Sequence, residues 1–237
     1  MNELLKHVVE AHGGFQRWYE ITVIRAAVSI NGPMWGRRGQ EGILSQVGIT
    51  AHVHQQHLVF TDFTAPGLRG VYTPRRVAVE DLDGNVLIER HTPREAYKGQ
   101  TLASTWDVLH ALYFAGYSMW NYLTTPYLLT HPDVTTEELE PWQPSGERWR
   151  RLKAVFPPRI ATHSAEQIFS YDESGLLRRH DYAPYVMGDR PVAHRTEAHR
   201  TISGLVFPSY RYVLPLVDGR LAPDPVITVD LIDITVD

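Results

Sequence analysis

Cysteine is absent from this sequence of 237 residues, which excludes disulfide bridges, cysteine-ligated zinc or iron–sulfur sites and thiol nucleophiles. Lysine is scarce, since Lys6, Lys98 and Lys153 are the only lysines among the 23 basic residues. Arginine therefore carries nearly all of the positive charge. A GC-rich genome accounts for such a bias, and arginine also suits forked contacts with carboxylates and stacking on aromatic rings.

The glycine-rich loops that cradle nucleotides, GxGxxG and GxxxxGK[ST], are missing, and so is the GxSxG elbow of the α/β-hydrolases. Excess positive charge is missing too. With 27 acidic and 23 basic residues the net charge is −4, so neither nucleic acid nor an acidic membrane surface is an expected partner. Residues 1–7 show no basic region leading into an apolar run, which is what a signal peptide would need. We expect a soluble cytoplasmic protein of undetermined oligomeric state.

Short alternating segments bounded by turn-forming residues predict the fold class. They indicate about ten strands, mostly in hairpin order, over 23–30, 41–47, 50–60, 70–79, 85–90, 149–156, 163–171, 176–185, 194–202, 208–214 and 226–236. Helical spacing of apolar residues predicts one helix at the N-terminus and another over 106–124. The pattern predicts a single α+β domain over residues 1–237, in which a curved antiparallel sheet, an open half-barrel, wraps around the two helices.

The mid-chain segment from Val108 to His131 contains no Asp, Glu, Lys or Arg across 24 residues. Its length would suit a membrane span, but His110 and Asn121 make it too polar, so no membrane-spanning segment is expected. It is a central core helix or a helix that lines an apolar pocket, and these two interpretations are compatible. Tyr and Trp suit an apolar cavity that needs a few polar tips. The candidate ligand-binding aromatics are Trp106, Tyr113, Tyr117 and Trp120.

The twelve histidines bear most directly on chemistry, because histidine titrates near neutral pH. On the strand expected over 176–185, Arg178, His180 and Tyr182 share one face. His163 lies on the preceding strand and His194 on the following one. Such residues either form solvated strand faces or converge inside the half-barrel.

If they converge, the set is suited to acid/base chemistry. We expect His180 and His194 to move protons, His163 to assist, and Tyr182 to hold developing negative charge. The residues expected to bind or orient a substrate are Arg178, Arg211 and Tyr210, together with the four aromatics named above.

A second histidine group, His52, His54 and His57, is an exposed polar strand or part of a metal site. No carboxylate lies at a characteristic offset from it and the HExxH pattern is absent, so no metal ligand is assigned. We also expect no cofactor.

Both ends of the chain resemble a known family. The residues that carry the resemblance are Ala11-His12-Gly13-Gly14 with Trp18, the hairpin Phe169-Ser170-Tyr171-Asp172-Glu173-Ser174-Gly175-Leu176-Leu177, and the turn Ser203-Gly204-Leu205-Val206-Phe207-Pro208. They are similar to uncharacterised bacterial proteins related to the lipoprotein-localisation (LolA-like) superfamily. The resemblance implies an open antiparallel half-barrel around helices, with an apolar cavity that holds acyl chains.

Two functions follow as alternatives. In the first, the half-barrel encloses an aromatic or polyketide-like molecule and acts on it by cofactor-independent acid/base chemistry, as an isomerase, cyclase or hydrolase. In the second, the protein is a non-catalytic carrier or sensor that holds an apolar or lipid ligand in the same half-barrel. A histidine-ligated metal enzyme is a third reading.

Overall fold

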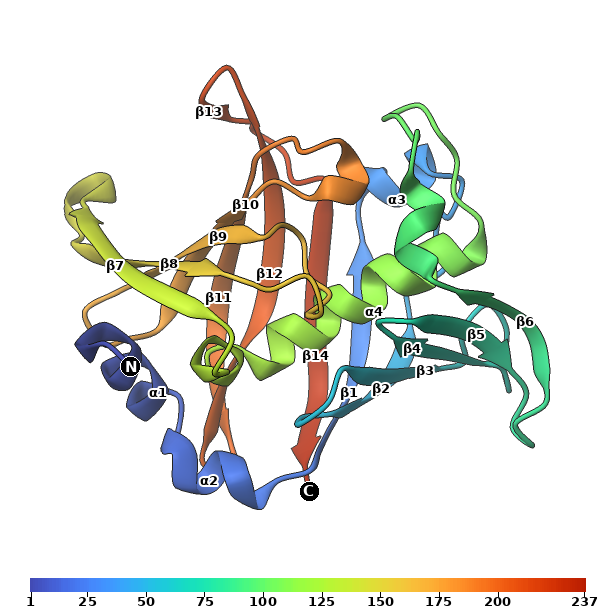
Figure 1. Ribbon diagram of the computed structural model, residues 1–237, viewed down its shortest axis with the longest axis horizontal. Coiled ribbons are helices and arrows are strands. Elements are labelled where there is room, and N and C mark those ends of the chain that lie inside the picture. Colours follow the sequence, from blue (N-terminus) through green and yellow to red (C-terminus); the bar gives the residue numbers. More distant parts are fainter.

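Two antiparallel meanders, one from each half of the chain, meet along β1 and β14 in the computed structural model of the protein (Figure 1). The structure describes residues 1–237, with the exception of the side chain of Ser145. Over these residues one sheet contains 14 strands, in the order β6-β5-β4-β3-β2-β1-β14-β12-β11-β10-β9-β8-β7, with β13 paired to β12. Every pairing is antiparallel.

The strands of the first meander are β1 (Val23–Asn31), β2 (Val47–His52), β3 (His57–Thr61), β4 (Arg69–Thr73), β5 (Arg76–Glu80) and β6 (Val86–His91). Those of the second are β7 (Thr135–Trp142), β8 (Trp149–Val155), β9 (Glu166–Tyr171), β10 (Leu177–Tyr182), β11 (Val192–Ile202), β12 (Leu205–Val217), β13 (Arg220–Leu221) and β14 (Ile227–Val236). Because β1 pairs with β14, the two ends of the chain hold the two halves of the sheet together.

The α-helices of the described chain are α1 (Glu3–Ala11), α2 (Gly14–Glu20), α3 (Pro33–Arg37) and α4 (Val108–Thr124). Short 3₁₀ turns are η1 (Pro93–Tyr97), η2 (Tyr127–Thr130), η3 (Pro144–Gly146) and η4 (Tyr185–Met187). Helix α4 begins at a capping box: the Asp107 side chain accepts from the His110 backbone N–H, and the His110 side chain accepts from that of Asp107. Among the described residues, no helix has the length and apolar character needed to cross a membrane.

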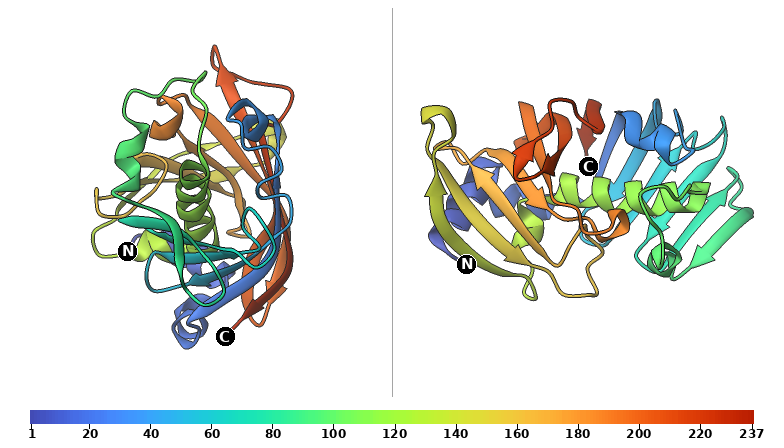
Figure 2. Two further views of the ribbon diagram at one scale, coloured as in Figure 1. Left: turned by 90° about the vertical axis from the view of Figure 1, so that its right-hand side faces the viewer. Right: turned by 90° about the horizontal axis from the view of Figure 1, so that it is seen from above.

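Helix α4 lies on the concave side of the sheet and is buried along almost its whole length (Figure 2). It packs on β3, β4 and β5, while α1 packs on β8 and η2. The helix approaches β4 closely at Gly116, where an added Cβ would lie only 2.3 Å from Cγ of Tyr72. The expected core helix is confirmed, and it fills the hollow of the curved sheet.

The antiparallel α+β class is confirmed, but the sheet has 14 strands rather than about ten. The segments 50–60 and 70–79 each form a two-stranded hairpin instead of one strand, and 41–44 is a turn. The turn between β4 and β5 contains neither Gly nor Asn, and the Thr73 hydroxyl supports it by donating to the Arg76 carbonyl. Strand β7 falls outside the predicted strands. It lies at the sheet edge, where exposed glutamates interrupt the alternation of apolar and polar residues.

Candidate functional site

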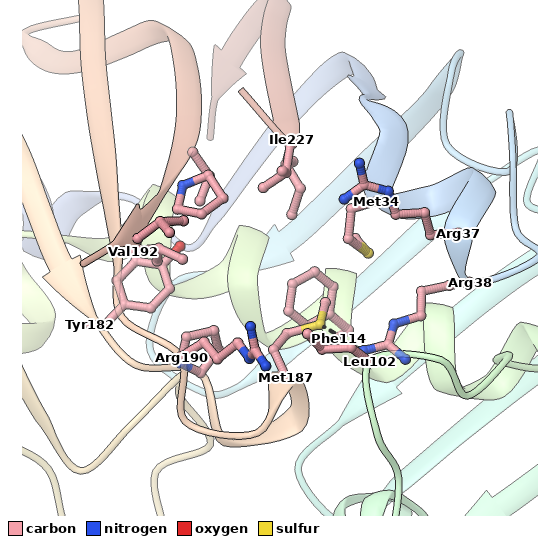
Figure 3. A pocket seen from close by; sticks show the side chains of 15 residues that line it. Met34, Arg37, Arg38, Leu102, Phe114, Tyr182, Met187, Arg190, Val192 and Ile227 are labelled. Carbon is pink, nitrogen blue, oxygen red and sulfur yellow. Dashed lines mark hydrogen bonds between the residues drawn. The ribbon is translucent and has the colours of Figure 1, made fainter. Parts of the chain in front are cut away.

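An apolar cavity of about 320 Å³ opens on the concave side of the sheet, between α3, η4 and strands β10, β11, β12 and β14. Its floor is formed by Val192, Val213 and Ile227 from three adjacent strands, with Phe114 from α4 beside them. Figure 3 shows Val192, Ile227 and Phe114 around the cavity. The other apolar residues that line it are Met34, Leu102, Pro184, Met187, Pro215, Val217 and Val226. The only polar side chains that line the cavity in the described chain are Tyr182, Arg37, Arg38 and Arg190.

Strand register explains why these side chains share a floor. Val192 pairs with Tyr182 of β10, and Val213 pairs with Ile227 of β14. Alternate residues of a strand face the same side, so residues two further along each strand also point into the half-barrel. There the face becomes polar, with His180 and His194 as direct cross-strand partners.

This buried polar cluster is connected by hydrogen bonds that begin at the cavity floor. The Tyr182 ring lines the cavity, whereas its hydroxyl lies 3.2 Å from the Tyr122 hydroxyl and 3.5 Å from Nδ1 of His194. The Tyr122 hydroxyl is also 2.8 Å from Nε2 of His163. His180 donates from Nε2 to Oε1 of Gln167 at 2.6 Å. Tyr182 is therefore shared by the cavity and the cluster.

The three histidines of the cluster are neutral at physiological pH because the protein removes them from water. Burial lowers the pKa of His163 to about 3. Burial also lowers the pKa of His180 and His194 well below the ordinary value, and the positive charge of Arg211 lowers both further.

Arg211 contributes a buried positive charge next to the cluster. Its guanidinium donates to the backbone carbonyl of Tyr122 at 3.1 Å and lies 4.9 Å from the centre of the Tyr122 ring. Tyr122 belongs to the last turn of α4, where the helix dipole is negative and stabilises a cation. No carboxylate pairs with Arg211 among the described residues, and burial lowers its pKa to about 10, so it stays charged.

The structure brings together five of the residues predicted to form the site: His163, His180, Tyr182, His194 and Arg211. Arg178 lies elsewhere, because a β-bulge between Leu177 and Arg179 alters the register and Arg178 pairs with Asp172 instead. Tyr210 neighbours Arg211 in sequence but packs beside Tyr212, with the two ring centres 5.7 Å apart.

The four predicted aromatics are buried in the core around α4. Trp106 donates from Nε1 to Oε1 of Gln100, and Trp120 donates from Nε1 to the His52 carbonyl. Tyr113 and Tyr117 pack on one another, with ring centres 5.3 Å apart. A ligand-binding role for these four residues stays a prediction.

Sequence reasoning missed most of the cavity itself. Its floor consists of ordinary apolar strand residues that form no motif, so only their cross-strand register could have grouped them. The pair Arg37-Arg38, at the C-terminal end of the short α3 helix, was a local signal that could have been noticed.

The second histidine group is divided between two strands and the turn that joins them. His54 lies in the turn between β2 and β3, where its Nε2 is 3.0 Å from the Ile21 carbonyl. His52 instead pairs across the hairpin with His57. Among the residues that the structure describes, no three His, Asp or Glu side chains are grouped so as to hold a metal ion.

An open antiparallel sheet that curves around one buried helix, with an apolar cavity on its concave side, has the architecture of an open half-barrel. The LolA-like resemblance in the sequence is confirmed at the level of the fold. A DUF1329 family protein from Desulfovibrio piger matches with a TM-score of 0.57 at 12% identity, over 99% of this chain and 92% of that one.

Two further solved structures share the fold. A LolA superfamily protein from Nitrosomonas europaea has a TM-score of 0.57 at 11% identity, over 99% of this chain and 92% of its own. An outer membrane lipoprotein-sorting protein domain from Vibrio parahaemolyticus has a TM-score of 0.56 at 8% identity, over 99% and 91%. No protein-family model and no curated protein matches the chain.

The prediction of an isomerase, cyclase or hydrolase is wrong. The proteins that share the fold are described as LolA-superfamily and lipoprotein-sorting proteins, which points away from an enzyme. The interior of this chain gives a physical reason: His163, His180 and His194 are 1%, 4% and 0% exposed, and none of them lines the cavity. A general base must reach the proton that it abstracts, and these imidazoles are enclosed by the core.

Proposed function

We propose that this protein binds one hydrophobic ligand in the 320 Å³ cavity and carries or senses it without altering it. The observation that carries the proposal is the cavity's continuous apolar floor, because an apolar surface kept open to solvent is stabilised when a ligand covers it. The lipoprotein-sorting role named for the Vibrio parahaemolyticus domain, which shares the fold, supports the same class of function.

The shape and lining of the cavity favour a flexible aliphatic ligand over a large aromatic one. Phe114 and Tyr182 are the only aromatic rings that line it in the described chain, and aliphatic side chains form most of the surface. Met34 and Met187 face each other across it, and methionine adapts its shape to flexible apolar partners. A volume near the small end of the usual range for ligand pockets suits one chain rather than several.

Native mass spectrometry of the purified protein, compared with its denatured mass, is the first test. An organic adduct that is lost on denaturation would identify the ligand class. Binding is then measured with uncharged primary alcohols of increasing length. Each additional methylene should tighten binding about 4-fold until the cavity is full, because burial of one methylene contributes about 0.8 kcal/mol.

Val213→Phe fills the floor of the cavity, and Val155→Phe makes the same substitution at the exposed last residue of β8 as a matched control. The first variant should lose alcohol binding by about ten-fold or more, while the second should bind as the original protein does. If no alcohol of any length binds, or if Val213→Phe binds as well as its control, the proposal is wrong. Circular dichroism of both variants establishes that they are folded.

A further inference from the structure

Three arginines line an otherwise apolar cavity, and no acidic residue lines it in the part of the chain that the structure describes. We propose that the ligand is an anionic amphiphile, whose charged head lies between Arg37 and Arg190 at the mouth and whose apolar chain lies along the floor. This inference rests on the proposed function and narrows it to a ligand class. Arg37 ends α3 and Arg190 precedes β11, and they lie on opposite sides of the cavity (Figure 3).

Arg38 differs from the other two because its guanidinium is already occupied. It is 2% exposed and donates to the backbone carbonyls of Thr101 and Ser104 at 2.6 and 2.7 Å. Its other terminal nitrogen lies 3.2 Å from Sδ of Met187. Arg38 therefore positions the cavity wall, including Met187, and leaves no free donor pair for a ligand.

Arg37 and Arg190 are exposed, and neither forms an ion pair or a side-chain hydrogen bond with any described residue. Two arginines that border other concavities of this chain are instead paired, Arg178 with Asp172 and Arg179 with Asp181. Two unpaired guanidiniums that flank one apolar cavity place positive charge where a ligand's polar end must emerge. Guanidinium groups bind carboxylates and phosphates through paired hydrogen bonds, so the head is an oxyanion.

A buried positive charge behind the cavity floor also favours an anionic ligand. Arg211 lies two residues from Val213 along β12, on the same face of the sheet, and carries its charge without a carboxylate partner among the described residues. A buried charge is screened less than a surface charge, so its field extends into the apolar cavity. A cationic ligand is therefore disfavoured at this cavity, even though the overall charge of the chain is −4.

The test compares three probes that share a dodecyl chain: dodecanol, kept below its solubility limit, and dodecanoate and dodecyl phosphate, kept below their micelle-forming concentrations. Affinities are measured by displacement of uncharged N-phenyl-1-naphthylamine, at a pH where both acids are ionised. The original protein should bind at least one of the two anions about ten-fold or more tightly than dodecanol, because charge-assisted hydrogen bonds outweigh neutral ones. The anion that binds better assigns the head to a carboxylate or to a phosphate source.

The decisive variant is Arg37→Gln with Arg190→Gln. Its control is Arg75→Gln with Arg200→Gln, which removes the same charge from two exposed arginines outside the cavity. The first pair should reduce the affinity for the anions to about that for dodecanol, and the control should keep the preference of the original protein. Dodecanol binding without any anion preference overturns this inference and leaves the proposed function intact. If the double variant Arg37→Gln with Arg190→Gln still prefers the anions to dodecanol, the inference is also overturned. If none of the three probes binds, the proposed function itself is contradicted.

Discussion

Nε2 of His163 lies 2.8 Å from the hydroxyl of Tyr122, in a part of the core from which water is excluded. Burial there lowers the pKa of His163 to about 3. Because the folded state keeps this imidazole neutral, a proton taken up below the ordinary pKa of 6.5 binds to the unfolded chain instead.

The first prediction is therefore a loss of stability in acid. The contribution of His163 is fully present above about pH 6.5 and is lost as the pH falls toward the folded-state pKa of about 3. Between about pH 6.5 and pH 5 this single histidine should lower the free energy of unfolding by about 2 kcal/mol. His180 and His194, whose pKa values burial also lowers, should add to the decline.

Urea denaturation at a series of pH values measures this loss. His163→Gln should flatten the decline between pH 7 and pH 5 by about 2 kcal/mol, whatever its stability at neutral pH. His91→Gln changes an exposed histidine and should follow the slope of the original protein. An equally steep decline in His163→Gln would show that His163 takes up its proton in the folded state.

The second prediction concerns the close approach of α4 to the sheet. Gly116→Ala places a methyl group 2.3 Å from Cγ of Tyr72, which is fully buried and cannot retreat. Overpacking of this kind costs about 1–3 kcal/mol and outweighs the gain in helix propensity, which is about 1 kcal/mol.

Gly36→Ala is the matched control for this substitution, because Gly36 is also helical and its added Cβ would meet nothing closer than 4.0 Å. It should be neutral or slightly stabilising. Thermal denaturation compares the two variants. Equal melting temperatures for them would mean that α4 and β4 have more freedom to separate than the structure shows.

The sequence predicted the antiparallel class and the core helix because those features depend on local periodicity. Strand number was underestimated at hairpins such as β4–β5, whose turn carries no glycine or asparagine signal. The hydrogen bond from the Thr73 side chain stabilises this tight turn. The alternation of apolar and polar residues, on which strand prediction depends, does not report such a contact.

The candidate site was predicted in part for a related reason. His180, Tyr182 and His194 converge for two reasons. Alternate residues of a strand face the same side, and strand pairing places His180 directly beside His194. The bulge at Leu177 breaks that period at one residue and turns Arg178 toward Asp172. The cavity floor escaped detection because an apolar residue that lines a cavity and one that fills a core have the same sequence pattern.

The third prediction compares how two adjacent arginines of the cavity, Arg37 and Arg38, contribute to stability. Arg38→Gln removes a buried guanidinium that holds the Thr101 and Ser104 carbonyls, and buried acceptors left without a donor are costly. We expect the free energy of unfolding to fall by about 2–4 kcal/mol. Arg37→Gln changes an exposed side chain and should shift stability by no more than about 0.5 kcal/mol.

Urea denaturation of the two variants measures this contrast, and limited proteolysis locates it. Arg38→Gln should expose the segment 101–104 to cleavage, because that segment loses its hydrogen bonds to Arg38, whereas Arg37→Gln should be cleaved no faster than the original protein. Stability losses of similar size in both variants would mean that Arg37 also holds the wall. In that case the donors of Arg37 would not be free for a ligand, and the head-group site would have to be sought at Arg190 or Arg211.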